Sequence, residues 1–196
     1  VSRTGTTRKH CNLELSLTRP LCFFDLETTG VNVAKDRIVE ISILKVFPNG
    51  NKEAKTWLVN PEMPIPPQTT AVHGITDEKV ANEPTFKQLS KQVNDMIKGS
   101  DLAGFNSDRF DIPLLAEEML RAGIDVEFKK QLTVDVQTIF HKMDKRNLSA
   151  AYSFYCGKNL ENAHRAAADT TATYEVLKAQ IENYDELEND VVKLSA

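Results

Sequence analysis

Three runs rich in apolar or β-branched residues lie within the first sixty positions, and they constrain the fold of this chain more than any other feature. The first run, residues 21–27 (LCFFDLE), ends at the turn signal of residues 28–30 (TTG), which predicts a buried strand followed by a turn. Residues 37–47 and 53–59 predict two further strands. The Asn-Gly pair within residues 48–51 (PNGN) is typical of a hairpin, so these two strands should pair antiparallel.

After this all-strand beginning, helical and strand patterns alternate along the chain. Apolar residues at helical spacing follow Pro84, which we expect at the first position of a helix. Short apolar runs at residues 101–105 and 132–136 predict two more strands. The expected helical segments are residues 69–72, 76–80, 84–97, 112–122, 138–144, 149–156 and 165–184. This order predicts an α/β fold with a mixed five-stranded β-sheet, antiparallel in its first three strands and then parallel, flanked by helices.

Length and composition favour one ordinary globular domain. The chain has 196 residues, of which 41% are hydrophobic and 27% are charged, and we expect a single domain over residues 20–182. Residues 1–19 show neither a strand nor a signal-peptide pattern, and we interpret them as a flexible leader or a cloning remnant. Residues 183–196 are acidic and polar and should form the frayed end of the last helix and a tail.

Cysteine usage, hydropathy and charge narrow the class of protein further. Three cysteines without a Cys-x-x-Cys spacing argue against zinc ribbons and disulfide frameworks and favour the reducing cytoplasm. No apolar run approaches the ~20 residues of a membrane span, so no membrane partner is expected. The net charge of −4 does not exclude a nucleic-acid partner, because four carboxylates that bind two divalent cations would offset it.

Two carboxylates on the first strand are the first candidates for chemistry. Asp25 and Glu27 are two residues apart, so both side chains should point to the same face of the strand. They lie at its carboxyl end beside a glycine turn, where ligands bind in open α/β sheets. The alternative is a solvent-facing edge pair. Two like charges on so apolar a strand are unfavourable, and a divalent cation would turn their repulsion into a binding site.

Three further titratable residues lie at or near the starts of predicted helices. Asp111 comes after the fourth strand and directly before a helix, where it would join a metal site, cap the helix or do both. Asp169 lies just inside the start of the last long helix, and His164 on the preceding loop could swing over the same site. Alternatively, His164 is a surface residue and Asp169 is a solvated acid favoured by the helix dipole.

Together these residues form the pattern Asp25-x-Glu27, Asp111, His164-x4-Asp169, which resembles the DEDDh signature of the DnaQ-like 3′–5′ exonuclease superfamily. The matching segments are FDLETTG (residues 24–30), VHGIT (72–76), GFNSDRFDIPLL (104–115) and HRAAADTTAT (164–173). The chain resembles the branch that contains the epsilon subunit of DNA polymerase III and other proofreading exonucleases. This resemblance covers residues 20–182 and implies a ribonuclease H-like fold.

The resemblance also implies a reaction and a set of catalytic residues. The reaction is hydrolysis of the phosphodiester at the 3′ end of single-stranded DNA, by a two-metal-ion mechanism that releases nucleoside 5′-monophosphates. Asp25, Glu27 and Asp169 would hold one Mg²⁺ or Mn²⁺ ion, and Asp25 with Asp111 would hold the other. His164 would be the general base that takes a proton from the attacking water.

A second set of residues is expected, by the same resemblance, to contact the substrate. These residues are Leu26, Thr28, Thr29, His73, Asn106, Phe110 and Arg165. Leu26 and Phe110 would stack on the last bases unless they are ordinary core residues. His73 would contact the terminal nucleotide or only hydrogen-bond to backbone. Asn106 would bind backbone or orient Asp111.

Two other functions stay open from the sequence. An exoribonuclease that trims RNA or short oligoribonucleotides would need the same carboxylates and a pocket that accepts the 2′-hydroxyl. A catalytically dead binding module would lack one of the five catalytic residues, and all five are present. For a proofreading enzyme, the expected partner is a DNA polymerase subunit.

Overall fold

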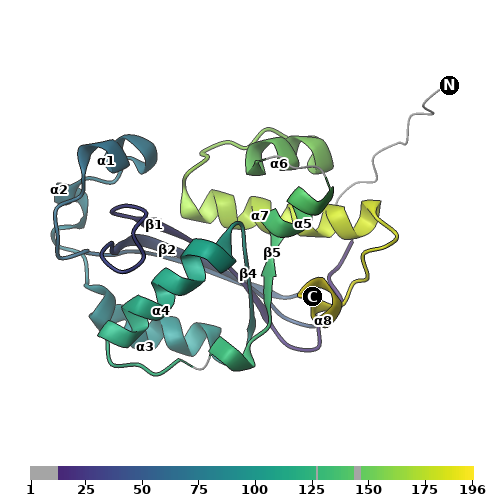
Figure 1. Ribbon diagram of the computed structural model, residues 1–196, viewed down its shortest axis with the longest axis horizontal. Coiled ribbons are helices and arrows are strands. Elements are labelled where there is room, and N and C mark those ends of the chain that lie inside the picture. Colours follow the sequence, from purple (N-terminus) through teal and green to yellow (C-terminus); the bar gives the residue numbers. More distant parts are fainter. Residues whose placement is uncertain (1–12, 127, 144–146) are drawn as a thin grey trace.

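The computed structural model describes residues 13–126, 128–143 and 147–196, and its centre is a five-stranded sheet in the order β3-β2-β1-β4-β5 (Figure 1). The strands are β1 (Leu21–Thr28), β2 (Ile38–Val46), β3 (Lys52–Leu58), β4 (Asp101–Gly104) and β5 (Thr133–Asp135). β1 and β3 pair antiparallel with β2, whereas β4 pairs parallel with both β1 and β5. The expected mixed sheet is confirmed.

Seven helices of the described chain lie close to the predicted segments, but the short helix at residues 191–194 lies where we expected only the end of the last helix and a tail. The helices of the described chain are α1 (Pro67–His73), α2 (Asp77–Val80), α3 (Phe86–Ile97), α4 (Ile112–Arg121), α5 (Val136–Met143), α6 (Leu148–Cys156), α7 (Ala166–Asn183) and α8 (Val191–Leu194). Pro84 is not the first residue of α3, as we expected. Thr85 caps this helix instead, because its hydroxyl accepts the N–H of Gln88 while the Gln88 side chain accepts the N–H of Thr85.

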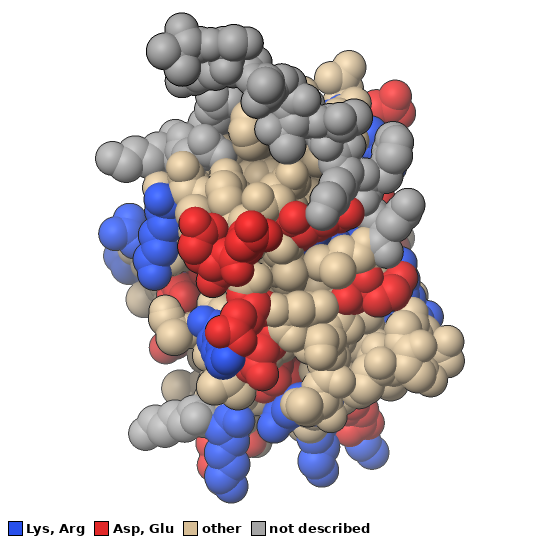
Figure 2. Space-filling view, turned by 90° about the vertical axis from the view of Figure 1, so that its right-hand side faces the viewer, with Lys and Arg blue, Asp and Glu red and all other residues tan. Residues whose placement is uncertain are grey.

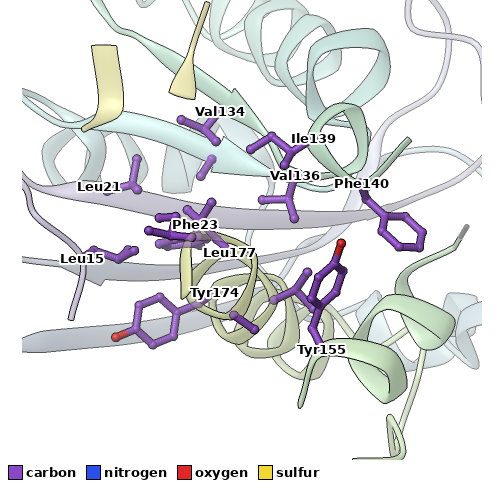
Figure 3. Packing of buried hydrophobic residues seen from close by; sticks show 14 of the residues in the cluster. Leu15, Leu21, Phe23, Val134, Val136, Ile139, Phe140, Tyr155, Tyr174 and Leu177 are labelled. Carbon is purple, nitrogen blue, oxygen red and sulfur yellow. The ribbon is translucent and has the colours of Figure 1, made fainter. Parts of the chain in front are cut away.

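The side chains of β1 alternate between two separate hydrophobic clusters. Leu21 and Phe23 pack with residues of α5, α6 and α7, whereas Cys22 and Phe24 pack with residues of α3 and α4. Since alternate positions of a strand face opposite sides, the sheet is a middle layer with helices on both faces, as Figure 1 shows. Figure 3 shows the first cluster, in which the ring of Tyr174 on α7 meets the ring of Phe23 edge-on at 5.3 Å. This packing fixes α7 against β1.

The two ends of the described chain lie against each other. Leu15 is buried in the α7-side cluster, and Asn189 bonds to the backbone of both Glu14 and Ser16. We expected a flexible leader up to residue 19, but residues 13–19 lie against the core and the C-terminal segment, while residues 1–12 lie outside the described residues. Within the described ranges, no helix is long and apolar enough to cross a membrane.

Candidate active site

The carboxylates of Asp25 and Glu27 stand at the end of β1 and point to the same face of the sheet. They continue the row of Leu21 and Phe23, which faces α7. Asp169 lies in the first turn of α7, and one oxygen from each of the three carboxylates lies within 4.8 Å of the other two. The structure therefore brings together the three residues that we expected to hold one metal ion.

His164 lies on a tight turn directly before α7. Its backbone has a φ of 65°, which is uncommon for a residue other than glycine and marks a constrained turn. Its N–H donates to Oδ2 of Asp169 at 3.2 Å, and its side chain is exposed. A proposed metal ligand thus holds the backbone of the proposed base, and the imidazole is free to meet substrate.

Asp111 is buried at the junction between a single π-helical turn, η1 (Ser107–Asp111), and α4. Its backbone is already helical, and within the described chain its side chain accepts no capping bond, so the capping alternative is wrong. The reason is that η1 runs directly into α4, so that Asp111 lies inside a continuous helical segment. Asp111 is outside the group of three oxygens, and its share in a second metal site stays a prediction.

Burial makes the negative charges of this cluster unfavourable. It raises the pKa of Asp25 well above the usual range, and the charges of Asp111, Glu27 and Asp169 raise that pKa further. The pKa of Glu27 rises to about 8, through burial and then the charges of Asp169 and Glu40, although Arg165 opposes the rise. Protonation or a bound cation would therefore stabilise this cluster.

The donor set of the cluster fits a hard divalent cation. Burial also raises the pKa of Asp169 to about 6, while the charge of His164 opposes this rise. Oδ1 of Asp169 is buried and has no hydrogen-bond partner within the described residues. An unpartnered buried oxygen beside two further carboxylates suits Mg²⁺ or Mn²⁺, which prefer oxygen ligands.

Leu26 occupies the opposite face of β1 from the carboxylates. Its side chain is 6% exposed and packs in the cluster beneath α3 and α4, so the core interpretation is correct and base stacking by this side chain is not supported. Phe110 is half-buried and packs against the same cluster. The hydroxyl of Thr28 donates to the carbonyl of Gly30, and Thr29 is almost fully buried.

His73 also belongs to the framework around the site. Its Nδ1 accepts the N–H of Ile75 at 3.1 Å, so Nε2 carries the proton and donates to the carbonyl of Thr28 at 3.1 Å. The ring is 4% exposed, and burial lowers its pKa. Both nitrogens are engaged by backbone, which agrees with the second alternative that the sequence allowed, and a nucleotide contact stays a prediction. His73 fixes the backbone that follows the two carboxylates of β1.

A comparison with protein families decides what kind of site this is. The family model RNase T, described as an exonuclease, matches residues 22–177. The chain belongs to this exonuclease family. It lies in the DnaQ-like superfamily, as the sequence resemblance implied, and the sheet order agrees with a ribonuclease H-like fold.

This chain is similar to proteins of several different lengths. The chain is 28% identical to the DNA polymerase III subunit epsilon of Treponema pallidum, over 82% of this chain and 76% of the relative. It is 27% identical to the PolC-type DNA polymerase III of Caldanaerobacter subterraneus, covering 89% of this chain but only 12% of that protein. Escherichia coli exonuclease I, solved with a dA16 oligonucleotide, shares the fold with a TM-score of 0.75 at 18% identity, over 86% of this chain and 42% of the other.

The exonuclease site opens into a cavity of about 430 Å³. Asp25, His164 and Asp169 line it on one side, and Asn106 lines it from the turn after β4. Arg165 does not line this cavity, although its charge acts on Glu27, and one guanidinium nitrogen lies 2.8 Å from where a Cβ on Gly74 would stand. That position is at the carboxyl end of α1, and a phosphate contact by Arg165 stays a prediction.

Two acidic residues of the exonuclease site were missed by sequence reasoning. Glu40 on β2 stands opposite Glu27 in the strand register, and its Oε1 accepts the N–H of Ala166, the first residue of α7. Asp135 ends β5, and its carboxylate accepts backbone N–H groups from the turn that leads to Asp111. A carboxylate at the end of a predicted parallel strand was the signal for Asp135. Glu40 gave no comparable signal within its apolar run.

Proposed function

We propose that this chain is a metal-dependent 3′–5′ exonuclease that removes nucleoside 5′-monophosphates from the 3′ end of single-stranded DNA. The observation that carries the proposal is the meeting of the Asp25, Glu27 and Asp169 oxygens within 4.8 Å, with His164 exposed beside them. With divalent cations bound, such a site would offset the charge of a phosphodiester and activate it for hydrolysis. Without a cation, the buried carboxylates only repel one another.

The chain's own residues divide the work as follows. Asp25, Glu27 and Asp169 would hold one Mg²⁺ or Mn²⁺ ion, and Asp25 with Asp111 a second. When bound, such ions offset the charge of the attacking and leaving oxygens. His164 accepts a proton from the attacking water, the role of a general base. The turn that carries His164 keeps the base beside the ligand Asp169.

The charge distribution supports a particular direction of approach for the nucleic acid. Figure 2 shows the side of the molecule that carries α8, where acidic side chains form a band. The acidic segment of residues 185–190 (DELEND) connects α7 to α8. An anionic strand is repelled from this side, whereas the carboxyl end of β1 and the start of α7 lie away from it, toward α1 in Figure 1. We therefore expect the strand to reach the site from a side other than that of α8.

The choice of DNA over RNA rests on what the relatives are. Two of them are DNA polymerase III components, and one structural neighbour was solved with a DNA oligonucleotide. A proofreading or repair role, and a polymerase partner, belong to the same proposal. The chain spans only 12% and 11% of its first two curated relatives, so these roles concern a domain that works within larger proteins in those cases.

The test is the degradation of 5′-labelled single-stranded DNA and of the matching RNA, each with Mg²⁺, Mn²⁺ or EDTA. We expect a ladder that shortens from the 3′ end of DNA, needs metal and is absent in Asp25→Ala. Asp95→Ala, an exposed carboxylate on α3, is the matched control and should keep full activity. Preferential shortening of RNA would reverse the substrate assignment, and no product from either strand would refute the proposed activity.

A further inference from the structure

The turn after β4 is built so tightly that it needs outside support. Asn106 has a φ of 61°, and a Cβ on Gly104 would lie 2.6 Å from Cβ of Ser107 and 3.3 Å from the carbonyl oxygen of Phe24. The chain then enters the π-helical turn η1, a rare form that is frequently found at functional sites. The first N–H groups of a helical segment have no acceptor within it. Some other group must therefore accept them.

Asp135 supplies these acceptors from the neighbouring strand. Its Oδ1 accepts the N–H of Asn106 at 2.8 Å, and its Oδ2 accepts the N–H of Asp108 at 3.2 Å. Oδ1 also accepts the N–H of Gln137 at 3.0 Å, at the start of α5. The side chain is buried, and Asp135 is the register partner of Gly104 across the parallel β4–β5 pair. One carboxylate thus ties the ends of two adjacent strands together.

A local role is the obvious alternative for this residue. Aspartate commonly accepts N–H groups at the start of a helix, and the bond to Gln137 is of that kind. The other two bonds run 29 and 27 residues back along the chain, to Asn106 and Asp108. They reach the segment that ends at Asp111, and capping of α5 does not require them.

We propose that Asp135 is a positioning residue of the exonuclease site, which holds η1 so that Asp111 faces Asp25 and Asn106 faces the cavity. Asp111 sits three residues after Asp108 in the same continuous helical segment, so a shift of η1 carries its carboxylate with it. Misplacement of a catalytic group by about 1 Å can reduce turnover by about 10²-fold. The effect on turnover rests on the proposed function, whereas the effect on backbone order does not.

Two substitutions divide the hydrogen bonds of Asp135. Asp135→Asn can keep Oδ1 for Asn106 and Gln137 but turns an NH₂ group toward the N–H of Asp108. Asp135→Ala removes all three acceptors. Asp101→Asn is the matched control, because Asp101 is equally buried at the opposite end of β4 and likewise accepts a backbone N–H from the neighbouring segment, that of Leu132.

Three measurements on the full chain test the proposal, namely amide hydrogen exchange, Mn²⁺ binding by calorimetry, and steady-state kinetics on single-stranded DNA. In Asp135→Ala we expect faster exchange over residues 105–111, weaker Mn²⁺ binding, and a kcat about 10²-fold lower with KM changed less than about threefold. Asp135→Asn should fall between this variant and the wild type. Asp101→Asn should lower the melting temperature but leave kcat within about twofold.

Two results would overturn the proposal. One is faster exchange confined to α5 with unchanged Mn²⁺ binding, which would leave only the capping role. The other is a loss of kcat in Asp101→Asn equal to that in Asp135→Ala, which would make the effect one of general stability. If the wild type had no nuclease activity, the proposed function would fail. Exchange over residues 105–111 and Mn²⁺ binding would still decide whether Asp135 positions η1.

Discussion

Replacing Glu27 by glutamine should make the metal-free protein more stable, although it removes a proposed metal ligand. Glu27 is half-buried, and one of its oxygens lies within 4.8 Å of oxygens of Asp25 and Asp169. Glu40 stands opposite it in the β1–β2 register. Burial and the charges of Asp169 and Glu40 raise the pKa of Glu27 from 4.5 to about 8. In the absence of metal, folding at neutral pH therefore requires this carboxylate to take up a proton that it does not hold in the unfolded chain.

The sign and size of the effect follow from this shift. Since the pKa is higher in the folded state, Glu27 causes no destabilisation below about pH 4.5, and the free energy of unfolding then falls by about 1.4 kcal/mol per pH unit up to about pH 8. At pH 7 the full conversion gives about 3 kcal/mol, and partial solvent screening reduces it to roughly 1–3 kcal/mol. For a domain of this size, that gain corresponds to a rise in melting temperature of roughly 2–10 °C.

Thermal unfolding of wild type and Glu27→Gln in EDTA, at pH 5, 7 and 8, measures this gain. The difference in melting temperature should be small at pH 5 and should grow toward pH 8. Added Mn²⁺ should stabilise the wild type more than the variant, because the wild type has more repulsion to relieve. Glu53→Gln, on the exposed edge strand β3, is the control and should show no such pH dependence. A variant less stable than wild type in EDTA at pH 7 would refute the reasoning.

Substitutions at three further residues test other parts of the structure. His164→Ala should lower kcat by about 10²–10⁴-fold while calorimetry shows unchanged Mn²⁺ binding, and an unchanged kcat would reject His164 as the base. Glu40→Ala removes the acceptor of the Ala166 N–H, so it should speed amide exchange at Ala166 and lower kcat. Glu40→Gln keeps an acceptor oxygen and should restore both values. Equal effects of the two variants would exclude this hydrogen bond as the cause. Glu118 is 1% exposed and pairs with two arginines, so Glu118→Ala should reduce the free energy of unfolding by about 1–3 kcal/mol in urea titrations, and an unchanged midpoint would contradict that pairing.

The two-residue side-chain period of a strand was enough to predict that Asp25 and Glu27 share one face. Asp25 and Glu27 point to one face because they are two residues apart, and the structure brings Asp169 to them. The same rule places Leu26 on the opposite face, in the core, so its expected contact with bases contradicted a regularity already visible in the sequence. For His73 the sequence allowed a hydrogen bond to backbone but could not identify the acceptor, the carbonyl of Thr28, which comes from 45 residues earlier in the chain.

At the start of α3 the predicted helix boundary is wrong, whereas at α4 only the capping alternative for Asp111 is wrong. At α3, Pro84 is a good first residue, but Thr85 and Gln88 form a reciprocal cap that starts the helix later. At α4 the predicted start at residue 112 is confirmed, but Asp111 is not a cap, because η1 runs directly into the helix. The hydrogen bonds of Asp135 to Asn106 and Asp108 support this preceding turn from another strand and leave no trace in local sequence.

The hydrogen bonds of the buried carboxylates separate structural acids from those available to a cation. The oxygens of Asp135 accept backbone N–H groups, and Asp101 accepts a backbone N–H and pairs with Arg19. A buried carboxylate that binds no ion needs such partners. Asp169 keeps one buried oxygen without a hydrogen-bond partner in the described chain, and Asp111 makes no cap. Acids left unsatisfied in this way raise one another's pKa, and a divalent cation is what removes that conflict. In our proposal, Asp135 holds η1 in place through its backbone hydrogen bonds, whereas Asp111 and Asp169 keep carboxylate oxygens available to bind a metal ion.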